Sequence, residues 1–380
     1  MLGTLKDFFL IDQTVVFLNH GAYGACPAPV FETYQNWQLE MECQPVDFLG
    51  RLSTAMLKEA RISLAEYVNA DAEDLIFVPN TTTGINAVAR SWQLQPGDEV
   101  LGTNHAYPSV DNTWGYVCQR SGAKYIRRPI ALPLTTEEDF IEVFWQGVTA
   151  KTKVISISHI TSPTSLTLPI KEICRRARES GIMTVIDGAH APGHIPLNLN
   201  ELGADFYTGN CHKWLCAPKG SAFLHVRKEH QEMLVPSVVS NWWGKDSTFT
   251  ERHEWQGTRD ISAFLSIPAA IEFQKRYNWD SVRKNCHTLA VETRQRIAEL
   301  TGLTHIAPDS WFGQMITVQL PPCDIYALKD RLYDEFRIEL PAVELDGQQY
   351  VRISFQGYND QSDADALVEA LEIILKDVTG

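Results

Sequence analysis

One stretch of the chain does most to decide its fold: DFYTGNCHKWLCAPKGSAFL, residues 205–224. Its two ends are apolar runs that predict strands at 205–208 and 221–226, and a polar loop joins them. Lys213 lies in that loop, between His212 and Trp214. A lysine held out of water at the end of a buried strand can lose its proton and attack an aldehyde. The stretch therefore predicts a buried sheet with a reactive amine at its edge.

Apolar runs alternate with helical patterns on the N-terminal side of this stretch. The segment IKEICRRARES (170–180) is an amphipathic helix that ends before Gly181. Strands and helices in this order indicate βαβ units and a mainly parallel sheet. Further strands are predicted at 75–78, 99–102, 154–159 and 183–187, and a further helix at 86–92.

The last third of the chain has a different pattern, which predicts a smaller α+β domain. Helices are expected at 263–277, 280–300, 325–336 and 362–377, with strands at 315–320 and 350–355. Ser362 is the expected N-cap of the last helix. We expect residues 15–265 to form a large domain, and residues 1–14 together with 266–380 to form a small one.

Composition excludes several classes of protein. The 380 residues are 44% hydrophobic and 21% charged, which is typical of a folded globular protein. The net charge of −14 opposes binding to nucleic acid or to anionic membranes. No apolar run reaches 18 residues, and the first 13 residues lack the features of a signal peptide. The eight cysteines form no C-x-x-C pair, so we expect reduced thiols in a cytoplasmic protein.

Polar residues follow several of the predicted strands. In an open parallel sheet, ligands bind beyond the carboxyl ends of the strands, so we expect these residues to share one site. They are Asn80, Thr81, Thr82, Thr83 and Gly84; Asn104, His105 and Tyr107; His159, Thr161 and Ser162; Asp187 and His190; and Asn210, His212 and Lys213.

The motif NTTTGIN (80–86) places three hydroxyls at the start of a helix. Backbone N–H groups and hydroxyls there suit a phosphate, although plain N-capping by threonine explains the same residues. The chain has neither a G-x-G-x-x-G fingerprint nor a Walker A motif, which opposes a nicotinamide oxidoreductase and a P-loop protein. Any phosphate in this site therefore belongs to another cofactor.

The motif TVIDGAHAPG (184–193) places Asp187 at a strand end among apolar residues. A carboxylate there needs a cationic partner, and a protonated pyridine nitrogen is one. Pyridoxal-phosphate (PLP) enzymes combine such an aspartate with a lysine like Lys213. Helix capping by Asp187, or a metal site with His190 and His194, are the alternatives. Pro192 and Gly193 disfavour the helix that this metal site needs.

A zinc site around His212 is not expected. Cys211 and Cys216 flank this histidine, but the segment offers no fourth ligand. We therefore predict no metal site.

These motifs, together with NHAYPS (104–109) and SHITSPTS (158–165), make the chain resemble the class V aminotransferases. FLNHGAYGACP (17–27) most resembles the isopenicillin N epimerase-like branch of that family. The resemblance covers essentially the whole chain. It implies an α/β protein of PLP fold type I, with a mainly parallel seven-stranded sheet in the large domain. It also implies a homodimer with active sites at the subunit interface.

The resemblance implies a role for each matching residue. Lys213 would hold PLP as a Schiff base and move the Cα proton, Asp187 would pair with the pyridine nitrogen, and His190 would support the cofactor at the same edge. The further implied contacts are Thr82, Thr83, Asn210 and His212 to the phosphate; Thr258 to the partner subunit's phosphate; His105 or Tyr107 stacked on the ring; Ser162 in place of an asparagine at the 3′-oxygen; and Arg352, Asn19 and His20 to the substrate.

Within this family the residues favour a lyase or an epimerase. A cysteine desulfurase needs a mobile cysteine ahead of the carboxylate-binding arginine, but residues 337–350 contain none. We expect an amino-acid substrate, in the first place a cysteine derivative, with Tyr107 as a second acid. The aromatic segment NWWG (241–244) either walls the substrate pocket or simply packs. An aminotransferase and a PLP-binding protein without catalysis are the alternatives.

Overall fold

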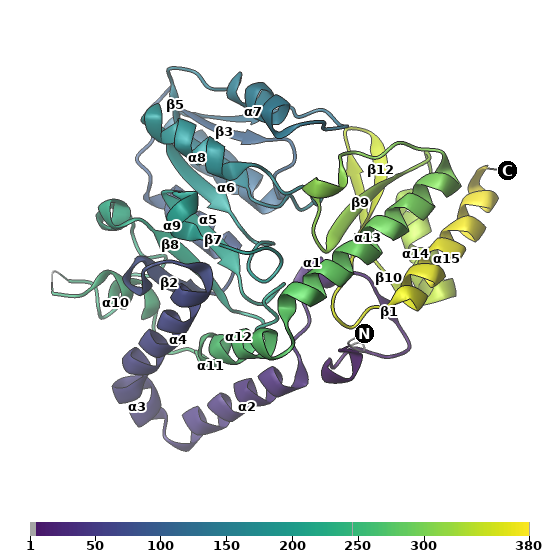
Figure 1. Cartoon of the computed structure of the whole chain (residues 1–380). Helices are drawn as coiled ribbons and strands as arrows, with labels where there is room; N and C mark the ends of the chain where they lie inside the picture. Colours follow the sequence, from purple (N-terminus) through teal and green to yellow (C-terminus); the bar gives the residue numbers. More distant parts are fainter. Residues whose placement is uncertain (1–4, 245, 380) are drawn as a thin grey trace.

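The computed structural model describes residues 5–244 and 246–379, with side chains up to residue 377, and is built around a seven-stranded sheet (Figure 1). The strand order is β2-β8-β7-β6-β5-β3-β4, and only β8 runs antiparallel to its neighbours. The predicted mainly parallel sheet is thus confirmed. The strands are β2 (Leu75–Val78), β3 (Glu99–Thr103), β4 (Lys124–Arg128), β5 (Thr152–Ser158), β6 (Met183–Asp187), β7 (Phe206–Asn210) and β8 (Ala222–Val226).

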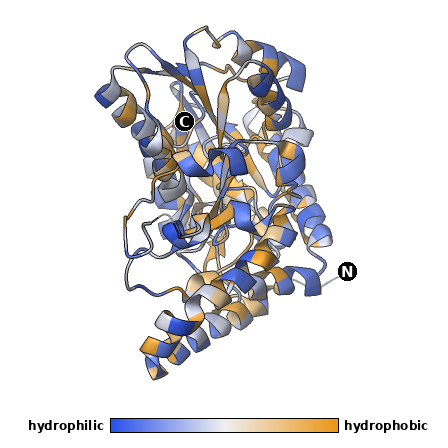
Figure 2. Cartoon of the chain, turned by 90° about the vertical axis from the view of Figure 1, so that its left-hand side faces the viewer, coloured by the Kyte–Doolittle hydropathy of each residue, from blue (hydrophilic) through white to orange (hydrophobic). Residues whose placement is uncertain are grey.

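Helices cover both faces of this sheet, which explains why its central strands are continuous apolar runs. Successive side chains of a strand point to opposite faces. In β2, Leu75 and Phe77 join the apolar cluster on one face of the sheet, whereas Ile76 and Val78 join the cluster on the opposite face. Figure 2 shows hydrophobic strand segments in the interior and hydrophilic segments on the outer helices.

The α-helices α1 to α12 precede the C-terminal part of the chain. They are α1 (His20–Tyr23), α2 (Ala28–Cys43), α3 (Pro45–Asp47), α4 (Ser53–Val68), α5 (Thr81–Ser91), α6 (Pro108–Ser121), α7 (Glu137–Trp145), α8 (Ile170–Glu179), α9 (Leu199–Leu202), α10 (Phe249–Glu254), α11 (Ser262–Leu265) and α12 (Ile267–Arg276). Shorter helical turns lie at Lys6–Phe8, Phe48–Leu52, Ala72–Asp74, Lys228–Met233 and Asp309–Trp311. No described helix is long and apolar enough to cross a membrane.

The C-terminal part contains a second, smaller sheet, as predicted. Its strands have the order β11-β12-β9 and are antiparallel, and α13, α14 and α15 pack beside them (Figure 1). β1 pairs in parallel with β10, which ties the N-terminal segment to this part. The elements are β1 (Val16–Phe17), β9 (Met315–Leu320), β10 (Ile338–Glu339), β11 (Ala342–Leu345), β12 (Gln348–Ser354), α13 (Trp279–Thr301), α14 (Ile325–Phe336) and α15 (Gln361–Thr379).

The division into domains of residues 15–265 and residues 1–14 with 266–380 stays a prediction. One apolar cluster runs through both parts, from Leu5 to Leu375, so packing does not mark a boundary.

Three expectations about individual helices differ from the structure. Ser362 does not cap the last helix, because α15 already begins at Gln361 and the Asp360 carboxylate accepts the Ser362 N–H at 2.9 Å. The single helix expected at 263–277 is divided into α11 and α12, since Pro268 lies in the first turn of α12, where a missing N–H is tolerated. The helix expected at 86–92 starts earlier, at Thr81, with Asn80 as its N-cap.

Gly84 allows the start of α5 to lie directly on β7. A Cβ atom at this position would overlap the Thr208 side chain. We predict that Gly84→Ala lowers the free energy of unfolding by about 1–3 kcal/mol, because a packed sheet cannot move aside. Urea denaturation measures this change. Gly115→Ala in α6 is the matched control, since a Cβ atom added there would have open space around it; it should be neutral or stabilising by roughly 0.5–1 kcal/mol. Equal stability of the two variants would contradict the close approach.

Candidate active site

A cavity of about 340 Å³ lies beyond the carboxyl ends of the parallel strands, where the strand-end residues were expected to meet. It brings together residues from the ends of β6 and β7 and the starts of α5 and α6. Its lining is Ala22, Tyr23, Pro79, Asn80, Thr81, Thr82, Tyr107, Ser109, Val110, Ile160, Ser162, Asp187, Ala189, His190, Asn210, His212, Lys213 and Gly220.

Lys213 follows β7 and projects its amine into this cavity. Its Nζ lies 3.1 Å from His190 Nε2. Burial, aided by the positive charge of Arg352, lowers the pKa of Lys213 to about 7. Near neutral pH a large fraction of this amine is therefore unprotonated and nucleophilic.

The N-terminal segment holds the backbone of the lysine in place. His20 Nε2 donates to the Lys213 carbonyl at 3.0 Å, and His20 Nδ1 accepts from the Tyr358 hydroxyl at 3.0 Å. Gly24 has φ +71° and packs so closely on the backbone of His212 and Lys213 that a Cβ atom would overlap it. Positive φ and close approach both require glycine here.

Asp187 ends β6 and lines the cavity with an unpaired charge. Its Oδ1 accepts the Ala189 N–H at 3.0 Å, and Asp187 forms no ion pair among the residues that the structure describes. Burial raises the pKa of this carboxyl, although Ala189 and Lys213 act against the rise. A cationic group beside Asp187 would therefore stabilise the ionised carboxylate.

The two histidines that follow Asp187 are both engaged by the protein. His190 Nδ1 accepts from the Trp214 indole at 3.2 Å. His194 Nε2 accepts from the Gln314 N–H at 2.7 Å, and its Nδ1 donates to the His190 carbonyl at 3.1 Å. Residues 187–194 form no regular helix. These contacts oppose the metal site that the spacing of His190 and His194 left open.

The start of α5 forms one end of the cavity. Asn210 Oδ1 accepts the Thr81 N–H at 2.9 Å, and Thr82 Oγ1 lies 3.1 Å from Ser109 Oγ. His212 Nδ1 donates to the Ser221 carbonyl at 2.9 Å, which leaves Nε2 available. A helix N-terminus with hydroxyl, amide and imidazole groups around it suits a phosphate.

Thr83 lies off this cavity. Its N–H and hydroxyl both bond to Asn80 Oδ1, at 2.9 and 3.1 Å. Asn80 caps the helix and also lines the cavity, which Thr82 lines as well.

Arg352 is a buried cation on β12, behind the cavity wall. Its Nη1 donates to the Ser162 carbonyl at 2.7 Å and to Ser162 Oγ at 3.0 Å. Its Nε has no hydrogen-bond partner, and no carboxylate pairs with it in the described part of the chain. Burial lowers its pKa to about 10. An arginine with unused donors next to a ligand cavity is suited to bind a carboxylate.

The structure separates the two residues considered for ring stacking. Tyr107 lines the cavity and is 45% exposed. His105 is buried behind the wall, with Nδ1 2.8 Å from Thr164 Oγ1 and Nε2 2.9 Å from the Ile130 carbonyl. Only Tyr107 faces the cavity, and its role there stays a prediction.

Three other predicted residues do not line the cavity. Asn19 Nδ2 donates to Glu339 Oε1 at 2.9 Å, and His20 holds the lysine backbone. Thr258 is exposed on the loop after α10. The roles predicted for these residues remain predictions, because none of them touches the cavity of its own chain.

Several cavity residues were not among the polar residues predicted from the ends of the strands. Tyr23 and Ser109 line it, although neither directly follows a strand. The one sequence feature that could have pointed to Tyr23 is that it belongs to the motif FLNHGAYGACP (17–27). Trp242 and Trp243 are 46% and 54% exposed and do not line this cavity, so the role of NWWG stays a prediction.

We predict that Arg352→Met raises the pKa of Lys213 by roughly one pH unit or more, because a positive charge beside the ammonium is removed. The pH dependence of Lys213 acetylation by acetic anhydride, read by mass spectrometry, measures this pKa. Arg352→Lys keeps the charge and should stay close to the wild type. If the pH midpoint of Lys213 acetylation is the same in Arg352→Met as in the wild type, Arg352 does not lower the pKa of the amine.

Known proteins resemble this chain over its whole length. A family model described as Aminotransferase class-V matches residues 16–367. Isopenicillin N epimerase of Amycolatopsis lactamdurans is 34% identical, with 96% of each chain covered. A probable L-cysteine desulfhydrase, chloroplastic, of Arabidopsis thaliana is 31% identical over 98% of this chain and 85% of its own. The apo structure of a cysteine desulfurase from Thermococcus onnurineus NA1 superimposes with a TM-score of 0.86 at 20% identity, covering both chains completely, and so shares the fold.

Proposed function

The chain belongs to the aminotransferase class-V family, and we propose that it is an enzyme that removes the Cα proton of an amino acid and eliminates the β-substituent of a cysteine derivative. Its cofactor is pyridoxal 5′-phosphate, as in this family. The single observation that carries the proposal is the Lys213 amine, with a pKa lowered to about 7, in one cavity with the unpaired Asp187 carboxylate.

The cavity residues fit this cofactor. No described residue forms an ion pair with Asp187, and a protonated pyridine nitrogen would supply the missing cation. The start of α5, with Thr82 and His212, would hold the phosphate, and Lys213 would hold the aldehyde carbon. The volume of about 340 Å³ lies within the range of small-molecule sites, roughly 300–1,000 Å³. When bound, PLP supplies an electron sink for negative charge that develops at Cα.

The protein groups then have distinct tasks. Arg352, with Nε unused, would bind the substrate carboxylate and fix the position of Cα. Lys213 Nζ, once free, would take the Cα proton, since a pKa of about 7 leaves a large fraction of the amine neutral near pH 7. Asp187 keeps the ring nitrogen protonated. His190 lies beside Lys213 Nζ and would support the edge of the cofactor.

Elimination needs only one base, and Lys213 is that base. The C–S bond breaks, the thiol leaves, and the remaining fragment is hydrolysed to pyruvate and ammonium. No cysteine lines the described cavity, which opposes a persulfide-forming desulfurase. Similarity to a protein named L-cysteine desulfhydrase supports this choice of reaction.

Epimerisation is the second candidate, and one observation favours it. It needs a proton donor other than Lys213, and the half-exposed Tyr107 hydroxyl lines the same cavity. The 34% identity to a protein named isopenicillin N epimerase supports it as well.

We further propose a homodimer in the cytoplasm. The exposed Thr258 would reach the phosphate site of the partner subunit, so that each active site is shared. The exposed Trp242 and Trp243 lie on the chain shortly before it and would be covered in such a dimer. All eight cysteines are free, as expected in a reducing compartment.

Proton NMR in heavy water, with L-cysteine, cystine, cysteine sulfoxides and L-α-aminoadipyl peptides as substrates, tests the reaction. We expect pyruvate from a cysteine derivative. Loss of the Cα proton signal together with a D-product would establish epimerisation instead. A keto acid that appears only when a second keto acid is added would mark an aminotransferase. No change with any substrate would leave a PLP-binding protein and overturn the proposed reaction.

Tyr107→Phe separates the two candidates. Elimination should keep turnover within a few-fold of the wild type, because Lys213 is the only base it needs. Epimerisation should fall by roughly 10²-fold or more, the usual contribution of a positioned acid. Pyruvate formation that collapses in this variant would give Tyr107 an essential part in elimination.

Mixing two inactive variants tests the shared site. Lys213→Ala removes the base, and Thr258→Glu places a negative charge against the partner's phosphate. In the mixed dimer one site is doubly altered and the other is intact, so activity should return. Thr288→Glu, at an exposed position of α13, is the control that stays active alone. Mixed dimers that remain inactive would contradict the shared arrangement.

A further inference from the structure

We propose that Trp214 sets the protonation state of Lys213 by fixing the tautomer of His190, and is thus a positioning residue for the proton transfer. The inference deepens the proposed function and rests on it for its catalytic meaning. The geometry of the three side chains can be tested without any substrate.

The tautomer follows from one hydrogen bond. An indole nitrogen can only donate, and the Trp214 Nε1 lies 3.2 Å from His190 Nδ1. Nδ1 must therefore accept and carry no proton. Neutral His190 then bears its proton on Nε2, the nitrogen that lies 3.1 Å from Lys213 Nζ.

This tautomer presents an N–H to the lysine. A neutral amine has a lone pair that can accept this N–H, whereas an ammonium group has only donors to offer. Two donors would face each other if Lys213 were protonated in this geometry. The Trp214–His190 pair therefore favours the neutral amine, which is the form that can take a proton from Cα.

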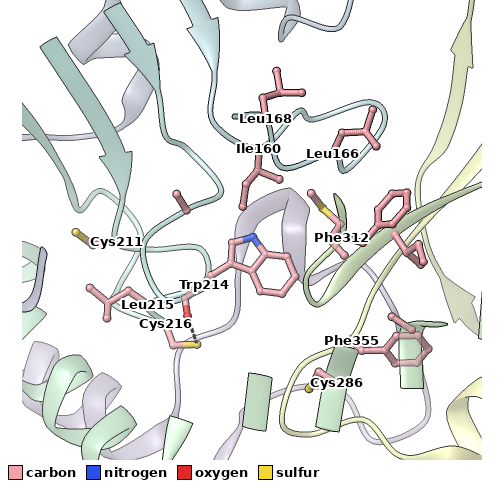
Figure 3. Close-up of a cluster of buried hydrophobic side chains, with 14 of the residues drawn as sticks. Ile160, Leu166, Leu168, Cys211, Trp214, Leu215, Cys216, Cys286, Phe312 and Phe355 are labelled. Carbon is pink, nitrogen blue, oxygen red and sulfur yellow. Dashed lines mark hydrogen bonds between the residues drawn. The ribbon is translucent and has the colours of Figure 1, made fainter. Parts of the chain in front are cut away.

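Trp214 is held so that it cannot turn away from His190. Its side chain is fully buried, and its ring stacks on His194 with centroids 4.1 Å apart and an angle of 29°. His20 packs against the ring at 4.9 Å, and the Trp214 carbonyl accepts from Gln274 at 2.9 Å. Figure 3 shows the indole in the centre of an apolar cluster, next to Ile160 and Leu215.

The other ionisable groups around this pair are few. Arg352 on β12 lowers the pKa of Lys213, and Asp187 on β6 raises it. His20 and His194 are buried, with pKa values lowered to about 3, so they stay neutral near pH 7. None of these charges changes when Trp214 loses its N–H, so the effect of that change can be assigned to His190.

Trp214→Phe removes the N–H and keeps a ring against His194. In the cofactor-free full-length chain, Lys213 acetylation should reach half its maximal rate at a pH about one unit higher, as expected for loss of one buried hydrogen bond. Trp114→Phe is the matched control: this tryptophan is also fully buried, but its Nε1 has no partner. Its acetylation profile should match the wild type. A Trp214→Phe profile that also matches it would overturn the proposal.

Nitrogen-15 NMR of histidine-labelled wild-type protein tests the tautomer directly and needs no stable variant. We expect His190, assigned by its loss in His190→Gln, to carry its proton on Nε2. A proton on Nδ1 would overturn the proposal.

A double variant tests whether Trp214 acts through His190. In the His190→Gln background, Trp214→Phe should no longer move the pH midpoint of Lys213 acetylation, because His190 no longer connects the two residues. A shift that persists in this background would contradict the proposed route through His190.

The PLP-loaded enzyme gives a third readout. In Trp214→Phe the rising limb of the pH profile of kcat should move to higher pH, because Lys213 must be neutral to act as the base. If kcat falls but the rising limb of its pH profile stays at the same pH, Trp214 supports the site only by packing. The NMR and acetylation results do not depend on catalysis, so failure of the proposed function leaves them interpretable.

Discussion

The rest of the site depends on keeping the Lys213 amine out of water. An ammonium group loses its hydration on burial, so the neutral form gains relative stability and the pKa falls. Several separate segments enforce this position. Lys213 follows the end of β7, and His20 and Gly24 contact its backbone. His190 Nε2 lies next to its Nζ. The seven-stranded sheet serves this arrangement by bringing the ends of β6 and β7 side by side.

Two buried charged side chains at or behind the cavity wall form no ion pair in the described part of the chain. Among the described residues no cation pairs with the buried Asp187 carboxylate, and no carboxylate pairs with the buried Arg352 guanidinium. Buried charges of this kind are costly unless a ligand completes them. A ligand with a cationic ring nitrogen and an anionic carboxylate satisfies both, which describes PLP together with an amino acid. Stability and function therefore oppose each other at these two positions.

Sequence patterns predicted the apolar strands well, since LIFV, MTVID and MITVQL are buried on both faces or tightly packed. β4 was not predicted, because its sequence KYIRR is charged and partly exposed at the edge of the sheet. Strand-end reasoning brought Asp187, Asn210 and Lys213 together correctly. It could not tell His105 from Tyr107, since two residues of a loop can point in opposite directions. The contact of Arg352 with Ser162 joins residues 190 positions apart and is set by tertiary packing alone.

The most direct test of the central role of Lys213 is to find the residue that carries the cofactor. The PLP-loaded protein would be reduced with sodium borohydride, digested and mapped by mass spectrometry. We expect the phosphopyridoxyl group on Lys213, in the peptide that also contains Trp214. Attachment to another lysine, or no attachment in a protein that otherwise binds PLP, would contradict the central role of the buried amine.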